Sequence, residues 1–388
     1  MKQRFQFFAP CPRGLEDVLA QELKELGAQD VSSTPGGVGF WGDWRLMQLA
    51  NLHSRIASRI LWRLVERPYR TEEDVYKTAR GVEWPELFEV TRTIKVAVTS
   101  IGCKLRSLDF VGLKVKDAIC DNFRAKGGER PSVDTVRPDM RIHVFITEHK
   151  VTLYLDTSGE ALFKRGYRQD TGEAPLRENL AAGILKLAGW QPGVVLLDPM
   201  CGSGTFLIEA ALMARNVAPG IDRYFAFEQF KHFEAAGWEA IREAAIAAVH
   251  PAPAAPIVGS DTDRKVLAAA EENLAAAGVS DVVTLEQADA LERTAPAAEG
   301  ILVCNPPYGI RLQEQDELAA LYPMLGHALK QRFSGWRAYY LTADMRLAKL
   351  IRLSASKRTV LFNGALECRL FEFKMVAGSN RKEKPEED

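Results

Sequence analysis

The sequence predicts an α/β protein in which two small α/β units precede a larger domain built on a doubly wound parallel sheet. Strand-like and helix-like patterns alternate through the first 157 residues. From about residue 165, short apolar runs alternate with long helical stretches, which is typical of a parallel sheet covered by helices. The length of 388 residues suits two or three domains.

The first 65 residues have the element order of a ferredoxin-like unit. A strand over about residues 3–9 is followed by an amphipathic helix that Gly27 closes. Pro35-Gly36-Gly37 predicts a hairpin. A helix near residues 45–51 and a strand near residues 58–65 complete the order β-α-β-β-α-β.

Residues 66–157 form a second predicted α/β unit. Thr71 is expected to cap a short helix with an acidic first turn. Alternation and periodicity then predict a strand at 94–98, a helix through Val111, Val115, Ile119 and Phe123, and strands at 142–146 and 151–155.

Cations are dense in the middle of this second unit. Lys114 and Lys116 lie near Asp117 and Asp121 in the sequence, which favours a solvated helix face for them. Four other cations lie at predicted helix or strand ends with fewer acids nearby, and we expect them to contact phosphate groups: Lys104, Arg106, Lys126 and Arg130.

Residues 158–378 form the predicted doubly wound domain. Five apolar runs predict its strands, at residues 194–197, 257–259, 282–285, 301–304 and 338–341. Residues 357–362 and 366–376 flank Asn363-Gly364 and predict a terminal antiparallel hairpin. The charged tail at residues 379–388 is expected to be disordered.

Composition limits the class of protein. Hydrophobic residues make up 47% and charged residues 26% of the chain, and the formal net charge is −1, so any nucleic-acid surface has to be a local patch. The six cysteines include no C-x-x-C pair, which favours reduced thiols over a disulfide framework or a metal site. No apolar run has transmembrane length and no signal-peptide core follows Met1. We expect a cytoplasmic protein without a metal or a membrane partner.

A strand, a glycine turn and a helix start follow one another between Leu196 and Thr205. Gly202 and Gly204 lack Cβ atoms and let a ligand approach the main chain closely. The third glycine of a dinucleotide-binding loop is replaced here by Leu207, which argues against a pyrophosphate site. Asp198, at the end of the strand, suits a cationic amino group such as that of a methionine moiety.

Two further acids follow the next two predicted strands. Asp261 leaves its strand directly and is the candidate for both ribose hydroxyls of a nucleoside. Asp263, two residues later, is expected to cap the following helix, which Gly278 closes. Asp289 is a candidate acceptor for an adenine amino group, although a solvated loop acid is an alternative reading of that segment.

Asn305-Pro306-Pro307-Tyr308 follows the apolar run that ends at Cys304. If the Asn305 side-chain carbonyl and the Pro306 main-chain carbonyl hold both hydrogens of a planar amine, the nitrogen lone pair can turn toward an electrophile. Prolines fix φ and donate no hydrogen bond, and the Tyr308 ring offers a face on which an extruded base can stack. The alternative reading is a Pro-Pro turn with Tyr308 filling space.

Taken in order, these strings resemble class I S-adenosylmethionine-dependent methyltransferases that act on amines, which have a Rossmann-like fold. Further strings narrow the resemblance: Arg165-Gly166-Tyr167-Arg168, Ala174–Ala181, Phe362–Cys368 and Leu113–Ile119. With the ferredoxin-like unit upstream, the chain is similar to THUMP-domain RNA guanine-N2 methyltransferases, and the Ala174–Ala181 and Asn363–Cys368 strings look like the large-subunit ribosomal type. The fused relatives carry a second catalytic half, and we do not expect the activity of that half here.

The resemblance assigns residues 66–157, with a profile beginning near residue 44, to a THUMP RNA-binding domain. It implies S-adenosylmethionine as cofactor and guanine N2 in 23S ribosomal RNA as target, at a site of the guanine-2445 type. It implies these cofactor contacts: Asp198, Gly202, Gly204, Thr205, Asp261, Asp289, Arg177, Glu178 and Asn179. A helix-capping role is the alternative for Arg177, Glu178 and Asn179. Asn305, Pro306 and Tyr308 would form the reaction centre, and Arg165 and Arg168 would join the RNA contacts.

The residues leave other targets open. Transfer RNA is the main alternative, because THUMP-bearing guanine-N2 enzymes of both kinds exist. An Asn-Pro-Pro-Tyr string also serves adenine-N6 and protein-glutamine methyltransferases. A non-catalytic RNA-binding assembly factor that retains the fold is a further hypothesis.

Overall fold

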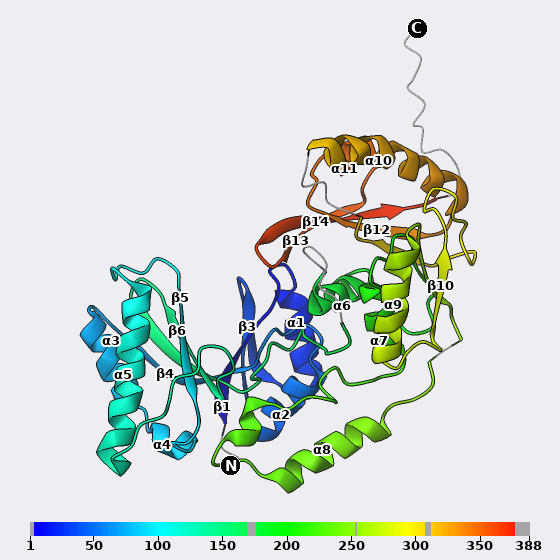
Figure 1. Ribbon diagram of the computed structural model, residues 1–388. Coiled ribbons are helices and arrows are strands. Elements are labelled where there is room, and N and C mark those ends of the chain that lie inside the picture. The colour runs from blue at the N-terminus through cyan, green and yellow to red at the C-terminus, as the bar shows by residue number, and fades with distance from the viewer. Residues whose placement is uncertain (1–3, 169–175, 253, 307–311, 377–388) are drawn as a thin grey trace. The chain divides into compact units, whose positions relative to one another are not determined.

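The computed structural model describes residues 4–168, 176–252, 254–306 and 312–376. The chain divides into two compact units, which are described separately (Figure 1). The first comprises Met1–Arg165 and Val217–Val249, and the second comprises Gly166–Asn216 and His250–Asp388.

The first unit begins with the predicted ferredoxin-like order. Its elements are β1 (Phe5–Pro10), α1 (Glu16–Glu25), β2 (Gln29–Thr34), β3 (Gly37–Gly42), α2 (Trp44–His53) and β4 (Leu61–Pro68). These four strands lie in the order β2-β3-β1-β4. This is the strand order that the β-α-β-β-α-β pattern has in a ferredoxin-like sheet. The predicted hairpin at Gly36 is confirmed, since β2 and β3 pair antiparallel across it.

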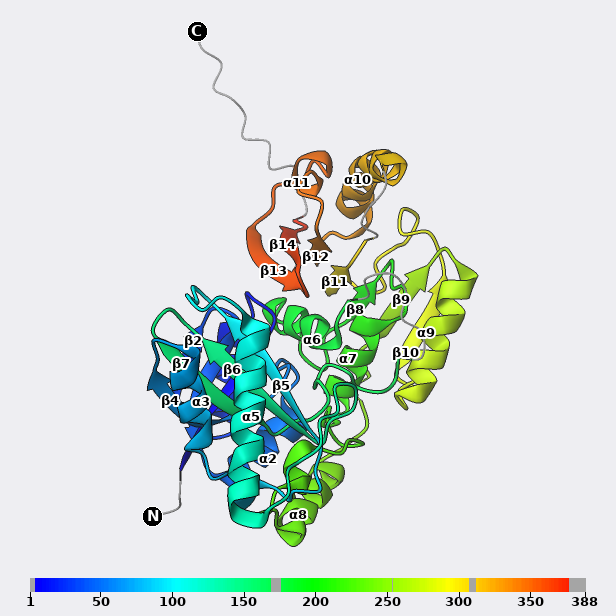
Figure 2. The same cartoon turned by 60° about the vertical axis from the view of Figure 1, so that its left-hand side comes forward.

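The same sheet continues into the second α/β unit. Its elements are α3 (Glu72–Arg80), α4 (Trp84–Leu87), β5 (Ile94–Ser100), α5 (Leu108–Gly127), β6 (Met140–Ile146) and β7 (Lys150–Asp156). Because β4 pairs antiparallel with β7, one seven-stranded sheet runs in the order β2-β3-β1-β4-β7-β6-β5. The helices α3 and α5 pack side by side next to β5 (Figure 2). The predicted cap is present, because the side chains of Thr71 and Asp74 form a capping box at the start of α3.

A later segment of the chain also belongs to the first unit. It contains η1 (Ala226–Gln229) and α8 (Ala235–Ala247), and α8 packs beside α2 (Figure 1). Main-chain N–H groups of this segment donate to carbonyls of the unit: Gly220 to Leu52 at 3.0 Å, Phe227 to Thr157 at 3.0 Å and Lys231 to Leu87 at 2.9 Å. The boundaries predicted from the sequence differ here, because they assign these residues to the third domain.

The second unit contains the predicted doubly wound sheet. Its elements are α6 (Glu178–Leu187), β8 (Leu196–Asp198), α7 (Thr205–Ala214), β9 (Ile257–Asp261), α9 (Arg264–Ala276), β10 (Val283–Gln287), β11 (Ile301–Cys304), α10 (Leu312–Arg332), β12 (Arg337–Thr342), α11 (Leu347–Leu350), β13 (Lys357–Asn363) and β14 (Leu366–Lys374). The strand order is β10-β9-β8-β11-β12-β14-β13. The first five strands in this order are parallel, and β13 and β14 form the predicted terminal hairpin.

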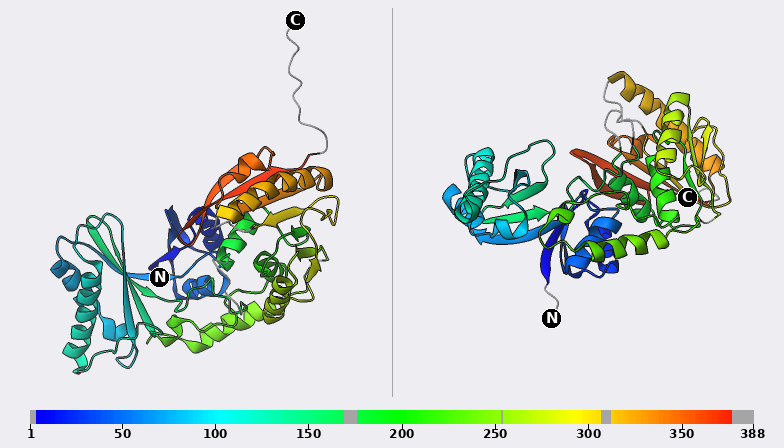
Figure 3. Two further views of the ribbon diagram at one scale, coloured as in Figure 1. Left: turned by 45° about the horizontal axis from the view of Figure 1, so that its top comes forward. Right: turned by 60° about the horizontal axis from the view of Figure 1, so that its bottom comes forward.

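Helices cover both faces of this sheet (Figures 1 and 3). Side chains of α10 and α11, among them Tyr322, Leu325 and Leu347, share one apolar core with residues of β8, β11, β12 and β14. The helices α7 and α9 contact β8, β9 and β10, and α6 packs on α7. The strand order reverses between β8 and β11, and ligands of doubly wound sheets bind at the carboxyl ends of the strands at such a point. Within the described residues, no helix combines the length and apolarity needed to cross a membrane.

Candidate active site

Two predicted site residues follow adjacent strands at the point where the strand order reverses. Asp198 ends β8, and Asn305 follows Cys304 at the end of β11. The two strands are parallel neighbours, with Leu197 paired to Leu302. Asp198 and Asn305 therefore lie at the same edge of the sheet.

The next two strands bring the other acids to this edge. Asp261 ends β9 and pairs in register with Gln287 at the end of β10. The main-chain N–H of Ala288 donates to the carbonyl of Asp261 at 3.1 Å. This bond holds the exposed Asp289 next to the end of β9.

The glycine turn between β8 and α7 needs its glycines for backbone reasons. Gly202 and Gly204 have φ values of +53° and +79°, which side chains other than glycine rarely adopt. The Gly202 N–H donates to Oδ2 of Asp261 at 3.1 Å, and the Asp263 N–H donates to Oδ1 at 3.1 Å. A Cβ atom on Gly202 would meet no atom within 4 Å, so the main chain at this position stays open to a ligand.

These two bonds fix the Asp261 carboxylate and leave it capacity to bind more. Each of its oxygens accepts one main-chain N–H and retains a further lone pair for a hydroxyl group. The side chain of Asp263 caps α9 by accepting from the Lys265 N–H at 2.8 Å, as predicted. The two acids therefore differ: the Asp263 side chain caps α9, whereas the Asp261 carboxylate faces the glycine turn.

Asp198 is the most perturbed acid of the site. Its side chain is buried, with 2% of the residue exposed, and it accepts a hydrogen bond from the Met200 N–H at 3.3 Å. Burial raises the pKa of Asp198 to about 8; the Met200 bond lowers it and the nearby Asp261 charge raises it further. Among the described residues, no cationic side chain forms a salt bridge with Asp198. A buried carboxyl group in this position fits a ligand ammonium group.

The beginning of α6 is tied to the beginning of α7 by a buried ion pair. Nε of Arg168 donates to Glu178 at 3.2 Å, and its Nη2 donates to the Leu176 carbonyl at 2.8 Å and to Oγ1 of Thr205 at 2.9 Å. The side chains of Arg168 and Glu178 are 9% and 8% exposed. Asn179, in the same turn of α6, is fully buried. The sequence predicts Arg168 among the RNA contacts; in the structure its buried guanidinium bonds Glu178, Leu176 and Thr205.

Arg177 connects α6 to the terminal hairpin. It is the exposed residue before α6, and its main-chain N–H donates to Oδ1 of Asn363 at 3.4 Å. A Cβ atom on Gly364, which has φ of +68°, would lie 2.9 Å from the Arg177 guanidinium. Two strings that are nearly 190 residues apart in the sequence, and that both support the family resemblance, therefore lie in contact.

The strand before Asn305 is buried and Asn305 itself is not. Cys304 is 1% exposed, whereas Asn305 is half-buried and Pro306 is buried. Burial raises the pKa values of the Cys304 and Cys201 thiols, so neither thiol supplies a thiolate nucleophile at neutral pH. Pro307 and Tyr308 lie outside the described residues.

One close contact of the site was not predicted from the sequence. A Cβ atom on Gly259 in β9 would lie 2.2 Å from Cδ1 of Leu207 in α7. Leu207 occupies the position of the third glycine in a dinucleotide-binding loop, so here the small residue is on the strand and the large one on the helix. A glycine inside an apolar strand run is the signal that could have indicated this contact.

The cations expected to contact phosphate lie in the first unit, apart from Arg168. Lys104 is exposed and pairs with Glu148 at 2.5 Å, and Lys126 pairs with Glu83. Arg106 and Arg130 are exposed. Arg106 and Lys104 line a cavity of about 480 Å³ before α5, together with Arg70. Arg165 donates to the carbonyls of Leu162 and Arg55 at 2.6 and 2.7 Å.

Three family models match consecutive parts of the chain. They describe the RlmL ferredoxin-like domain at residues 6–61, the THUMP domain at residues 69–156, and the RMKL-like methyltransferase domain at residues 165–372. The resemblance drawn from the sequence strings is therefore confirmed.

Curated relatives share the whole length of this chain. "Ribosomal RNA large subunit methyltransferase K/L" from Shewanella frigidimarina (strain NCIMB 400) is 40% identical over 387 residues, which cover 98% of this chain and 54% of the relative. The protein of the same name from Photobacterium profundum gives the same identity and coverage. The chain thus spans about half the length of the curated relatives it matches.

Solved structures agree with the fold and the cofactor. The methyltransferase SMU.472, crystallised with S-adenosylhomocysteine, is 31% identical with a TM-score of 0.88, covering 98% of this chain and 100% of that one. A Listeria monocytogenes str. 4b F2365 protein, named as an N6-adenine-specific DNA methylase, is 30% identical with a TM-score of 0.86, covering 96% and 97%. The predicted cofactor, S-adenosylmethionine, is confirmed at the level of the family. The chain belongs to the RMKL-like methyltransferase family and carries a THUMP domain.

Proposed function

We propose that this chain transfers the methyl group of S-adenosylmethionine to the exocyclic N2 of a guanine in large-subunit ribosomal RNA, in the cytoplasm. The proposed target position is of the guanine-2445 type. The observation that carries the proposal is the position of Asn305, which follows β11 beside the strand that ends in the buried Asp198. Asp261, held by the glycine turn, lies on the other side of β8.

Each acid has a separate part in binding the cofactor. The buried Asp198 accepts the ammonium group of the methionine moiety, because its carboxyl group has no cationic partner among the described side chains. Asp261 accepts the ribose hydroxyls with the lone pairs that its two main-chain bonds leave available. Asp289, exposed beyond β10, accepts from the adenine amino group. The Arg168–Glu178 pair fixes the first turns of α6 and α7 on which these contacts depend.

S-adenosylmethionine supplies an electrophilic methyl group on a sulfonium sulfur. Asn305 and the Pro306 carbonyl accept the two hydrogens of the guanine amine and stabilise the positive charge that develops on nitrogen. Pro306 has no N–H to compete for these contacts and its ring restricts the main chain. The methylated amine is acidic enough to lose its proton to water, so alignment and charge stabilisation carry the reaction and no general base is required.

Ribosomal RNA is supported as substrate by the names of the curated relatives and by the THUMP domain. The chain offers exposed cations for the RNA backbone in the first unit, including Arg106 and Arg130. Lys104 and Arg106 at the cavity before α5 are our candidates for phosphate contacts. Lys126 and Arg165 complete the proposed set.

The site chemistry also suits another planar amine. The name of the Listeria relative points to adenine N6 in DNA as a second candidate target. Transfer RNA remains an alternative among RNA substrates. In its described part, the first unit is built on a seven-stranded mixed sheet, which differs from the helical core of a helix-turn-helix reader of duplex DNA, and this favours RNA.

The proposal is tested by mass spectrometry of nucleosides from cells that lack this gene. We expect one N2-methylguanosine to disappear from the large-subunit RNA, to be mapped to its position by sequencing of nuclease fragments, and to return with the wild-type gene. Loss from transfer RNA alone would assign the chain to the alternative substrate. Loss of N6-methyladenine from DNA, with both RNAs unchanged, would overturn the RNA proposal.

A further inference from the structure

An aromatic pocket lies in the first unit, formed where the Val217–Val249 segment packs on the ferredoxin-like part. Its volume is about 240 Å³, and its walls include Trp44 from α2, Trp62 from β4 and Phe230 from the inserted segment. The centroids of the Trp44 and Trp62 rings are 4.8 Å apart at 75°, and the Phe230 ring lies 6.3 and 6.5 Å from them. The site proposed for methyl transfer uses none of these residues.

The rim of this pocket is polar. Arg45, His232 and Glu234 are exposed at its edge, and Gln48 is half-buried. Together these side chains offer hydrogen-bond donors and acceptors around an apolar floor. A planar heterocycle binds in an apolar pocket whose rim offers both hydrogen-bond donors and acceptors.

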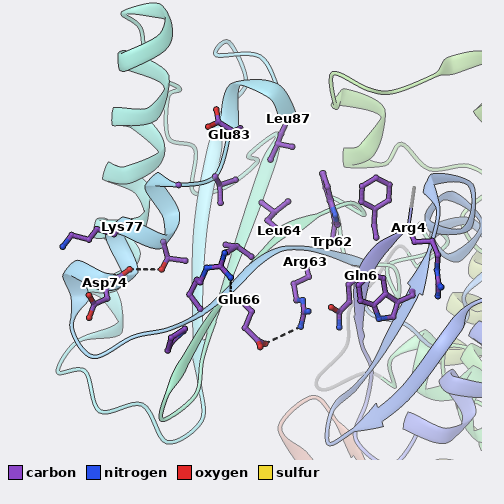
Figure 4. Close-up of a pocket in the computed structure, with 18 residues that line it drawn as sticks. Arg4, Gln6, Trp62, Arg63, Leu64, Glu66, Asp74, Lys77, Glu83 and Leu87 are labelled. Atoms are coloured by element: carbon purple, nitrogen blue, oxygen red, sulfur yellow. Dashed lines mark hydrogen bonds and ion pairs between the residues drawn. The ribbon is translucent and has the colours of Figure 1, made fainter. Parts of the chain in front are cut away.

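The pocket shares two lining residues with a second, larger groove. Trp62 and Leu87 line both, and the groove has a volume of about 1050 Å³ (Figure 4). It extends from Arg4 and Gln6 on the β1 side, across β4, to Lys77 on α3 (Figure 4). A polymer chain that follows the groove can thus place one group in the aromatic pocket.

The acids of the groove already have partners. Glu66 bonds Lys150 at 3.0 Å and Arg63 at 3.4 Å, and Glu83 pairs with Lys126. Asp74 accepts the main-chain N–H groups of Arg70 and Thr71 at 3.0 and 2.9 Å.

Two cations of the groove have no such partner. Arg67 and Lys77 are exposed, and no carboxylate of the described part of the chain pairs with either. The groove is lined by four cations, Arg4, Arg63, Arg67 and Lys77, and by three acids, Glu66, Asp74 and Glu83. The net charge of its lining is therefore +1, which favours a phosphate backbone over a cationic peptide as the ligand.

We infer that the aromatic pocket binds one unpaired nucleobase of the RNA substrate, other than the nucleotide that is methylated, while the groove carries the adjoining phosphates. The inference rests on RNA being the substrate, as proposed above. Stacking of a base on the Trp44, Trp62 and Phe230 rings requires a single-stranded segment, because a base offers its face to an aromatic side chain only when it is not stacked inside a helix. The pocket thereby selects RNA that presents a loop or a bulge.

Gly237 gives a test that does not remove an existing contact. It lines the pocket from α8, and a Cβ atom there would meet nothing within 4 Å. Gly237→Leu places a side chain at the pocket and favours the helix, since leucine is a better helix former than glycine. Ala236→Leu is the matched control, because Ala236 is exposed on the same helix and does not line the pocket. Gln48→Leu is a second pocket variant.

The measurement is fluorescence anisotropy with a labelled uridylate decamer and with an abasic ribose-phosphate chain of the same length. Wild type and Ala236→Leu are expected to bind the decamer roughly tenfold more tightly than the abasic chain, as base stacking on aromatic side chains provides. Gly237→Leu and Gln48→Leu should weaken or lose this preference, with unchanged affinity for S-adenosylmethionine and unchanged midpoints of thermal unfolding.

A Gly237→Leu variant that keeps the full preference for the base-bearing decamer would overturn the inference. A protein side chain would then be the better candidate for the occupant of the pocket. Wild type that methylates RNA but binds both probes equally would also overturn it, without affecting the proposed function. Wild type that binds neither probe and methylates no RNA would contradict the proposed function itself.

Discussion

The protonation state of Asp198 should make the affinity for the cofactor depend on pH. Burial raises the pKa of this carboxyl group to about 8, so without a cation beside it about nine-tenths of the molecules carry a neutral Asp198 at pH 7. The ammonium group of S-adenosylmethionine should favour the carboxylate. Binding at pH 7 is therefore expected to release close to one proton.

The expected magnitude follows from this linkage. Below the raised pKa, each unit of falling pH weakens cofactor binding by about tenfold, or roughly 30-fold between pH 7 and pH 5.5. The ligand ammonium group remains protonated in this range, so its own titration does not contribute. Asp198→Asn cannot ionise, and its affinity should be at least roughly 30-fold weaker than that of wild type at pH 7 and independent of pH.

The same shift has a consequence for stability without cofactor. Because the folded state binds the Asp198 proton more tightly than the unfolded state, stability is greatest below about pH 4 for this group and declines as pH rises toward about 8. Asp198→Asn should lack this part of the decline. Comparison of wild type with Asp198→Asn isolates the contribution of this one carboxyl group.

Titration calorimetry in two buffers of different ionisation enthalpy measures the released proton and the dissociation constant together. Wild type should release close to one proton at pH 7, and Asp198→Asn should release none. Equal pH profiles for the two proteins between pH 5.5 and 7 would refute the assignment of Asp198 to the ammonium group.

Three further substitutions test other parts of the site. Asn305→Ala should keep cofactor affinity within about threefold but lose at least roughly a hundredfold in kcat, since the contacts of Asn305 form chiefly in the transition state. Near-normal turnover in a methyl-transfer assay would contradict this expectation. Gly259→Ala should lower the free energy of unfolding by about 1–3 kcal/mol, because the added Cβ atom would lie 2.2 Å from Cδ1 of Leu207. Urea denaturation measures this loss, and an unchanged midpoint would show that α7 adjusts at no cost. Arg168→Met should cost about 3 kcal/mol of stability, because it removes the cationic partner of the buried Glu178 side chain. A stable Arg168→Met protein with a raised KM for RNA would instead support the phosphate contact expected from the sequence.

Much of the fold could be predicted because the relevant signals are local. Apolar runs and turn residues predicted every strand of the second unit, and Thr71 and Asp263 predicted the caps of α3 and α9. The site acids were also predictable, since a residue that directly follows a strand of a parallel sheet must lie at its carboxyl edge. This rule alone places three site residues at the same edge of the sheet: Asp198, Asp261 and Asn305.

Other features depend on contacts between distant parts of the chain. Pairing of β4 with β7 joins two apparent units into one sheet, and nothing in either strand alone specifies that partner. Residues 217–249 pack on the first unit through main-chain bonds that carry no sequence signature. Arg168 resembles a phosphate contact in sequence, and only the burial of Glu178 beside it reveals the ion pair.

A crystal structure of this chain with S-adenosylhomocysteine and a guanine nucleotide is the most direct test of the proposed site. It should place the ligand's ammonium group on Asp198, its ribose hydroxyls on Asp261, and the guanine amine within hydrogen-bond distance, about 3 Å, of the Asn305 side chain. A ligand sulfur remote from Asn305, or a guanine bound with its amine turned away from that side chain, would contradict the account.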